Sequence, residues 1–271
     1  MKPSLILLFL FISLTSEQIF LSDGKEEERD QLQIEYQTLN DPEPNTILSY
    51  PKQLSQDKKH SVLVWAPGAG SKAGDYAGII KRLASHGFVV IGLASSPGDG
   101  TKAISALNWL DQKNKSPDSP LNGKLDMNTA GCSGHSLGGL ECEIAIAKDT
   151  RIRTSILNNS GDFGHVALAN VAADRPMAIV YGNNGMERPN AEADYGNNNV
   201  KAPACLIMMD GADHGHGSGP WDGMAATVAW FRWHLGGEVY RKADFVGSSG
   251  KYINGPIIGK QGNWKGQCKN F

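Results

Sequence analysis

A serine between closely spaced glycines is the part of this sequence best suited to chemistry. Residues 134–138 read Gly-His-Ser-Leu-Gly and fit the G-x-S-x-G pattern, in which a serine stands at the apex of a sharp strand-to-helix turn. Small residues on either side let the chain pack there without a clash. A strand-like run at 128–132 precedes the motif, and a helix face follows it with Leu137, Leu140, Ile144 and Ala147. The pattern predicts an exposed nucleophile, Ser136.

A serine hydroxyl is a poor nucleophile and needs a histidine base that a carboxylate orients. On strand-turn-helix scaffolds of this kind, the chain order is serine, acid, histidine. The segment 210–217 follows a predicted strand and carries two histidines, His214 and His216. We predict His216 as the base, because the glycines on both sides of it free its loop to reach Ser136. His214 is the alternative base. Other histidines are assigned to surface, helix-cap and turn positions: His60, His86 and His135.

The acid should follow the strand predicted at 177–181, since catalytic groups of a parallel sheet lie just after the carboxyl ends of its strands. Glu187 is the first carboxylate there, and we predict that it orients the base. Asp194 and Asp162 are the alternatives, because both lie within reach of plausible loops.

An acyl-transfer site must also hold the negative oxygen that forms on the substrate carbonyl. The backbone N–H of Leu137, directly after the serine, is one expected donor. The backbone N–H of Ala69 is the other, in the loop that begins at Pro67 after a buried strand.

Strand and helix signals alternate along the chain, which predicts an α/β fold with a mostly parallel central sheet covered by helices on both faces. Continuous apolar runs such as 61–66 are typical of strands buried on both sides. The predicted strands are 46–50, 61–66, 88–92, 128–132, 154–157, 177–181 and 204–209, and the predicted helices lie near 76–83, 103–110, 137–147 and 224–235. We expect the turn-rich tail from about 236 to wrap the outside.

The length and net charge of the chain favour a single-domain globular protein and argue against a nucleic-acid-binding one. The chain has 271 residues, of which 40% are hydrophobic, enough for one large core. We therefore predict a single domain over 23–271 and expect a monomer. The net charge of -2 and the absence of long basic runs argue against nucleic-acid binding. No cysteine or histidine spacing suggests a metal site, and no cofactor is implied.

The N-terminus has the composition of an export signal. Lys2 is followed by an apolar run at 5–14 that is too short to span a bilayer. We predict a signal peptide over 1–22, no transmembrane segment after its removal, and a secreted or periplasmic protein. Export favours disulfides, but the cysteines allow three connectivities or buried free thiols: Cys132, Cys142, Cys205 and Cys268.

Several segments carry a resemblance to a known family. The segments 83–90, 134–139, 213–217 and 228–235 together resemble the α/β-hydrolase branch that holds dienelactone-hydrolase-like esterases, chlorophyllase-like enzymes and the cutinase-like polyester hydrolases that attack polyethylene terephthalate. The resemblance covers about residues 46–248. A Gly-His-Gly-Gly loop in one group maps the base onto His216, whereas the polyester hydrolases map it onto His214. Met186 stands where such relatives carry an aspartate, and the tail holds only Cys268 where the polyester hydrolases have a cysteine pair.

Together these features predict a secreted serine hydrolase that cleaves carboxylic esters through a Ser-His-acid triad and an acyl-enzyme. A polyester hydrolase and an amidase or peptidase are alternatives that use the same triad. A catalytically inactive hydrolase fold used for binding is the alternative outside the enzymes, and the intact Ser136 and the histidine loop weigh against it.

Overall fold

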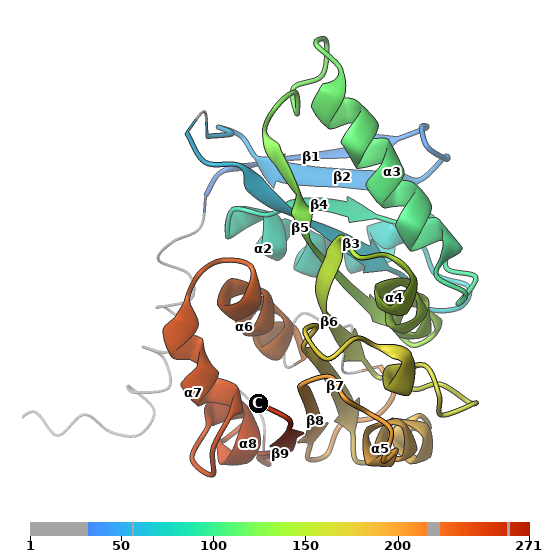
Figure 1. Ribbon diagram of the computed structural model, residues 1–271, viewed down its shortest axis with the longest axis vertical. Coiled ribbons are helices and arrows are strands. Elements are labelled where there is room, and N and C mark those ends of the chain that lie inside the picture. The colour runs from blue at the N-terminus through green and yellow to red at the C-terminus, as the bar shows by residue number, and fades with distance from the viewer. Residues whose placement is uncertain (1–31, 56, 216–222, 259–260) are drawn as a thin grey trace, which may run out of the picture. The chain divides into compact units, whose positions relative to one another are not determined.

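The computed structural model describes residues 32–271 apart from residue 56 and the segments 216–222 and 259–260 (Figure 1). The predicted signal peptide and His216 lie outside the described residues. None of the described helices is both long and apolar enough to cross a membrane.

A sheet of nine strands forms the centre of the described chain, in the order β1-β2-β4-β3-β5-β6-β7-β8-β9. The block from β4 to β8 is parallel, whereas β1, β2 and β9 run antiparallel to their neighbours. The predicted α/β class with a mostly parallel sheet is confirmed. The strands are β1 (Ile34–Leu39), β2 (Thr46–Pro51), β3 (His60–Ala66), β4 (Val89–Gly92), β5 (Leu125–His135), β6 (Ile152–Asn158), β7 (Met177–Gly182), β8 (Ala204–Met209) and β9 (Trp264–Lys269).

Helices cover both faces of this sheet (Figure 1). One face packs against α3 (Thr101–Lys115), α4 (Leu137–Lys148) and α5 (Arg188–Gly196). The other packs against α2 (Ala77–Ser85), α6 (Gly223–His234) and the short α7 (Lys242–Phe245) and α8 (Lys251–Asn254). Short 3-10 turns complete the set: η1 (Ala73–Tyr76), η2 (Leu168–Asn170) and η3 (Val239–Arg241).

The apolar run in β3 explains why both faces are covered. Successive side chains of a strand point to opposite faces. Val62 and Val64 accordingly belong to the hydrophobic cluster under α3 and α4, whereas Leu63 and Trp65 belong to the cluster under α2 and α6. All four are at most 1% exposed. A strand that is apolar on both faces is stable only when helices cover both sides of the sheet. Its last residue, Ala66, is paired with Gly134 of β5, which holds the carboxyl end of β3 beside the serine turn.

Apart from the short helices α7 and α8 and the 3-10 turns, three elements were not predicted from the sequence. β1 alternates half-buried and exposed residues at one edge of the sheet, and β9 is a polar edge strand at the other. The tail therefore adds a strand to the sheet instead of only wrapping the outside. The third is α5, which follows the loop that carries Glu187.

Two disulfides answer the connectivity that the sequence left open, and the described residues contain no free cysteine. Cys205 pairs with Cys268, which lies directly opposite it in the β8–β9 register. Cys132 pairs with Cys142 and ties β5 to α4. Disulfide formation in both pairs is compatible with an extracellular protein.

Candidate active site

Ser136 occupies the sharp turn between β5 and α4. Its backbone φ is 54°, a left-handed conformation that costs a non-glycine residue energy and that clusters at functional sites. The flanking glycines are required by close packing: a Cβ on Gly134 would lie 2.4 Å from the carbonyl oxygen of Gly138, and one on Gly138 would lie 2.0 Å from that of Ala66. The turn therefore accepts no side chain at either glycine, and the serine is held at its apex.

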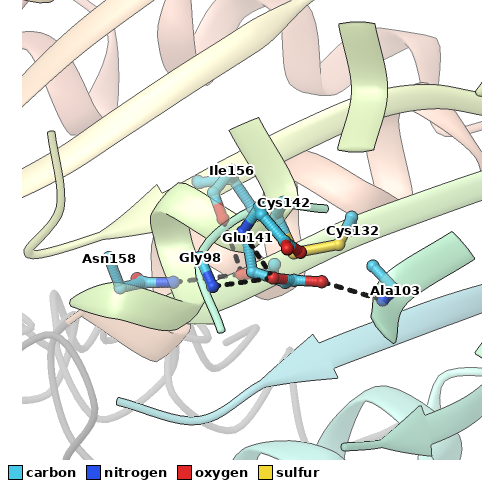
Figure 2. Close-up of a disulfide and its surroundings, with 9 residues drawn as sticks. Gly98, Ala103, Cys132, Glu141, Cys142, Ile156 and Asn158 are labelled. Carbon is cyan, nitrogen blue, oxygen red and sulfur yellow. Dashed lines mark hydrogen bonds between the residues drawn. A yellow bond between two sulfur atoms is a disulfide. The ribbon is translucent and has the colours of Figure 1, made fainter. Parts of the chain in front are cut away.

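A disulfide and a buried glutamate tie α4, the helix that follows Ser136, to the neighbouring chain (Figure 2). The Cys132–Cys142 disulfide closes a loop of sequence separation 10 that contains Ser136. Beside it, the fully buried carboxylate of Glu141 accepts hydrogen bonds from the backbone N–H groups of Gly98, Asp99 and Ala103. These contacts join the first turns of α4 to β5 and to the start of α3, so the helix behind the serine is fixed on two sides.

The structure brings Ser136, His214 and Glu187 into one hydrogen-bonded row. His214 Nε2 lies 3.0 Å from Ser136 Oγ, and His214 Nδ1 lies 2.7 Å from Glu187 Oε2. A carboxylate oxygen only accepts, so Nδ1 carries the proton, and Nε2 is free to accept the serine hydroxyl. Glu187 is 5% exposed at its side chain, whereas His214 is 32% exposed. The row thus runs from a buried carboxylate to a hydroxyl at the surface of a cavity.

Asn159 supports the carboxylate and was not predicted from the sequence. Its Nδ2 donates to Glu187 Oε1 at 2.7 Å and to the backbone oxygen of Asp213 at 3.0 Å. The backbone N–H of Gly182 also donates to Oε1, at 3.3 Å. Asn159 directly follows β6 and has a φ of 51°, a conformation that asparagine tolerates better than most residues. An asparagine directly after a buried strand was the available signal.

The alternative acids form a separate cluster. Asp194 accepts hydrogen bonds from His165 Nδ1 at 3.0 Å and from the backbone N–H of Asp162 at 2.5 Å. Asp162 in turn accepts from the backbone N–H groups of residues 164, 166 and 167. Burial raises the pKa of Asp194 to about 6. Neither carboxylate is among the hydrogen-bond partners found for His214 in the described chain.

A cavity of about 250 Å³ opens in front of Ser136 and His214. Both residues predicted to supply oxyanion donors, Ala69 and Leu137, line it. Its other lining residues are Leu140, Asn159, Ser160, Gly161, Phe163, Met186, Glu187 and Asn190. Phe163 and Met186 are exposed at 81% and 79%. The opening is therefore mostly apolar, with polar groups gathered at the reactive end. Within the described residues, no group of three or more His, Cys, Asp or Glu side chains is arranged to hold a metal ion.

Comparison with known proteins places this site in a family. No curated protein matches the sequence. The model of the PETase family, described as PET hydrolase-like, matches residues 44–248, which is more than half of the chain. The match spans the described sheet from β2 to β8 and contains Ser136, His214 and Glu187. The chain therefore belongs to the PET hydrolase-like family, a polyester-hydrolase-like branch of the α/β-hydrolases.

Proposed function

We propose that this protein is a serine esterase that cleaves carboxylic esters through an acyl-enzyme, with Ser136 as nucleophile, His214 as general base and Glu187 as the orienting acid. Family membership implies an ester hydrolase in general terms. The observation that carries the finer assignment is the row of contacts at 3.0 and 2.7 Å that joins the three side chains. A general base needs this reach to the proton that it removes.

The reaction begins when His214 Nε2 takes the proton of Ser136 as the oxygen attacks the ester carbonyl. The imidazolium that forms faces the Glu187 carboxylate, whose negative charge stabilises it. The carbonyl oxygen becomes negative, and the backbone N–H groups of Ala69 and Leu137 bind it at the positive N-terminal end of α4. His214 then protonates the departing alcohol, and a water molecule activated by the same imidazole releases the acid.

The base in this proposal is His214, the alternative, and not His216, the residue predicted first. The reason is positional, since His214 meets both Ser136 and Glu187. His216 lies outside the described residues. The same register is the one that the resemblance to polyester hydrolases implied for the base.

A polyester is the second candidate substrate. The family match favours it, and the apolar rim with Phe163 and Met186 suits a chain that continues beyond the scissile ester. Secretion is part of the proposal, supported by the apolar N-terminal run and by the two disulfides.

Hydrolysis of a soluble short-chain ester by the purified protein and by Ser136→Ala tests the proposal. The variant should lose turnover by at least about 10³-fold and keep its melting temperature, because only one oxygen that lines the cavity is removed. Ser248→Ala is the matched control, since Ser248 is an exposed serine in the turn after α7. Turnover by Ser136→Ala at the wild-type rate would reject the assignment.

A further inference from the structure

The side chains of His135 and Tyr76 join three loops around the serine, and neither has a role in the chemistry above. His135 precedes Ser136, and its Nε2 lies 2.8 Å from the backbone oxygen of His214. Its Nδ1 lies 2.9 Å from the hydroxyl of Tyr76, the last residue of η1. That hydroxyl accepts a hydrogen bond of 3.1 Å from the backbone N–H of Gly68. The contacts run from the Ala69 loop through the serine turn to the His214 loop.

For a neutral His135, the two ends of this row fix the direction of every hydrogen bond in it. The carbonyl oxygen of His214 can only accept, so His135 must carry its proton on Nε2. A neutral imidazole then has an acceptor at Nδ1, which takes the proton of the Tyr76 hydroxyl. The Tyr76 oxygen is left to accept from the N–H of Gly68, which can only donate. With His135 neutral, the row is satisfied in this one arrangement.

Burial favours that neutral form. It lowers the pKa of His135 below the ordinary histidine value. The hydrogen bond to the His214 carbonyl opposes this in part, the His214 imidazole lowers the pKa further, and the Glu187 charge raises it slightly. The rings of Tyr76, His135 and His214 also pack in sequence, with centroids 5.9 and 5.0 Å apart. At a given pH the imidazole is therefore more often neutral, and so an acceptor toward Tyr76, than a solvent-exposed histidine is.

Gly68 packs so closely against this row that a larger residue at its position would collide with it. A Cβ placed on Gly68 would lie 2.9 Å from Nδ1 of His135 and 3.1 Å from the hydroxyl of Tyr76. The backbone at Gly68, which leads into Ala69, therefore packs directly against the hydrogen-bonded atoms of His135 and Tyr76. Tyr76 itself is 6% exposed and packs on Trp65 of β3, with ring centroids 5.4 Å apart.

We propose that His135 and Tyr76 are positioning residues, which lock the oxyanion loop and the base loop onto the nucleophile turn through the directed row Gly68 N–H to Tyr76 O–H to His135 to His214 C=O. The inference rests on the proposed function. Because the row sets the place of the Ala69 N–H group and of the His214 ring, it acts on the transition state more than on substrate binding.

The test measures kcat and KM for a soluble ester with Tyr76→Phe, His135→Phe, the two combined, and His135→Gln. Each phenylalanine keeps an aromatic ring and removes the polar atoms, whereas the glutamine side chain supplies both a donor group and an acceptor. Tyr50→Phe is the matched control, because Tyr50 is similarly buried, at 7% exposed, and among the described residues its hydroxyl accepts a hydrogen bond from Gln37 on β1, far from the row. Near-ultraviolet circular dichroism gives the folded fraction by which each kcat is normalised.

We expect each phenylalanine variant to lose about 10- to 100-fold in kcat with KM changed by less than about threefold. The double variant should lose no more than the worse single one, because either change breaks the same row. His135→Gln should recover most of the loss. The inference would be overturned if the kcat losses of the two single variants multiplied in the double variant, or if the variants changed KM alone. It would also be overturned if His135→Gln were no more active than His135→Phe. Ser136→Ala is assayed alongside: if it is inactive while the four variants match the wild type, only the positioning role fails.

Discussion

Glu187 is nearly buried and accepts hydrogen bonds at both carboxylate oxygens. Oε2 faces His214, and Oε1 is held by Asn159 and the N–H of Gly182. Its negative charge has two uses in the proposed reaction, since it selects the tautomer of His214 and stabilises the imidazolium. Removing the charge while keeping the shape should therefore affect turnover and leave the fold intact.

Glu187→Gln should lower kcat by about 10²- to 10⁴-fold, because the amide can donate to Nδ1 and so favours the tautomer that cannot accept from Ser136. Glu192→Gln is the control, as Glu192 is 41% exposed on α5 and meets Arg188 and Tyr181. Steady-state rates with a soluble ester give the comparison. Wild-type turnover by Glu187→Gln would remove this residue from the mechanism and return the search to Asp194 and Asp162.

Among single residues, the sequence could predict those that belong to a local pattern. The glycines around Ser136 and the position of Glu187 after a predicted strand are such patterns, and they point to two of the three proposed side chains. The choice between His214 and His216 depends on the direction in which a loop turns, which neighbouring glycines do not determine. His135 and Tyr76 make their contacts between loops far apart in sequence, so no local pattern marks them, and for Asn159 the local signal was only its place directly after a buried strand.

At the scale of elements, two covalent links hold the end of the sheet and the serine turn. Cys132–Cys142 closes a short loop between β5 and α4, with a sequence separation of 10. Cys205–Cys268 ties the tail strand β9 to β8 across a separation of 63. A cross-link stabilises mainly by limiting the unfolded chain, and it does so more strongly when the closed loop is long.

Replacing both cysteines of a pair by alanine should therefore cost about 3 kcal/mol for Cys132–Cys142 and about 4 kcal/mol for Cys205–Cys268. Denaturant unfolding of the two double variants measures this difference. The tail pair joins two strands, so its loss should also free β9 and expose the edge of β8 to protease. Equal stability of wild type and both variants would show that the links do not form in the native protein.

Whether a helix or strand could be predicted from the sequence depended on how apolar it is. The buried strands from β2 to β8 and helices α2, α3, α4 and α6 were predictable, because each shows a continuous or periodic apolar pattern. β1 and β9 lie at the two edges of the sheet, and many of their residues are polar and face solvent. Their amino-acid composition is therefore similar to that of loops. β9 pairs with β8 along its whole length, and its Cys268 is bonded to Cys205 of β8, contacts that its own sequence does not indicate.

At the scale of the whole molecule, one buried acid, Glu143, is expected to lower the stability of the folded protein as the pH rises. Glu143 of α4 is fully buried, and neither of its carboxylate oxygens has a hydrogen-bond partner in the described structure. Burial, with the nearby charges of Asp194 and Asp162, raises the pKa of Glu143 well above its ordinary 4.5. The folded protein therefore holds a proton there at pH values at which the unfolded chain has released it.

This proton balance fixes the direction of the pH dependence. Above a pH of about 4.5 the unfolded state binds fewer protons at Glu143 than the folded state, so this residue's contribution to stability falls as the pH rises, until the pH reaches the folded pKa. Glu143→Gln cannot titrate and should melt at a higher temperature than the wild type at neutral pH. The difference should shrink toward pH 4.5. Melting curves across this range, with Glu192→Gln as the exposed control, check it, and a difference independent of pH would contradict it.

Activation of Ser136 by His214 is the assignment on which the proposed chemistry of the whole molecule depends. Labelling of the folded protein by a fluorophosphonate probe, with the modified peptide identified by mass spectrometry, tests it without any assumption about the natural ester. We predict an adduct on Ser136, a labelling rate at least about 10³-fold lower in His214→Ala, and a rate within about tenfold of wild type in His216→Ala. An adduct on another residue, or fast labelling of His214→Ala beside an inert His216→Ala, would contradict it.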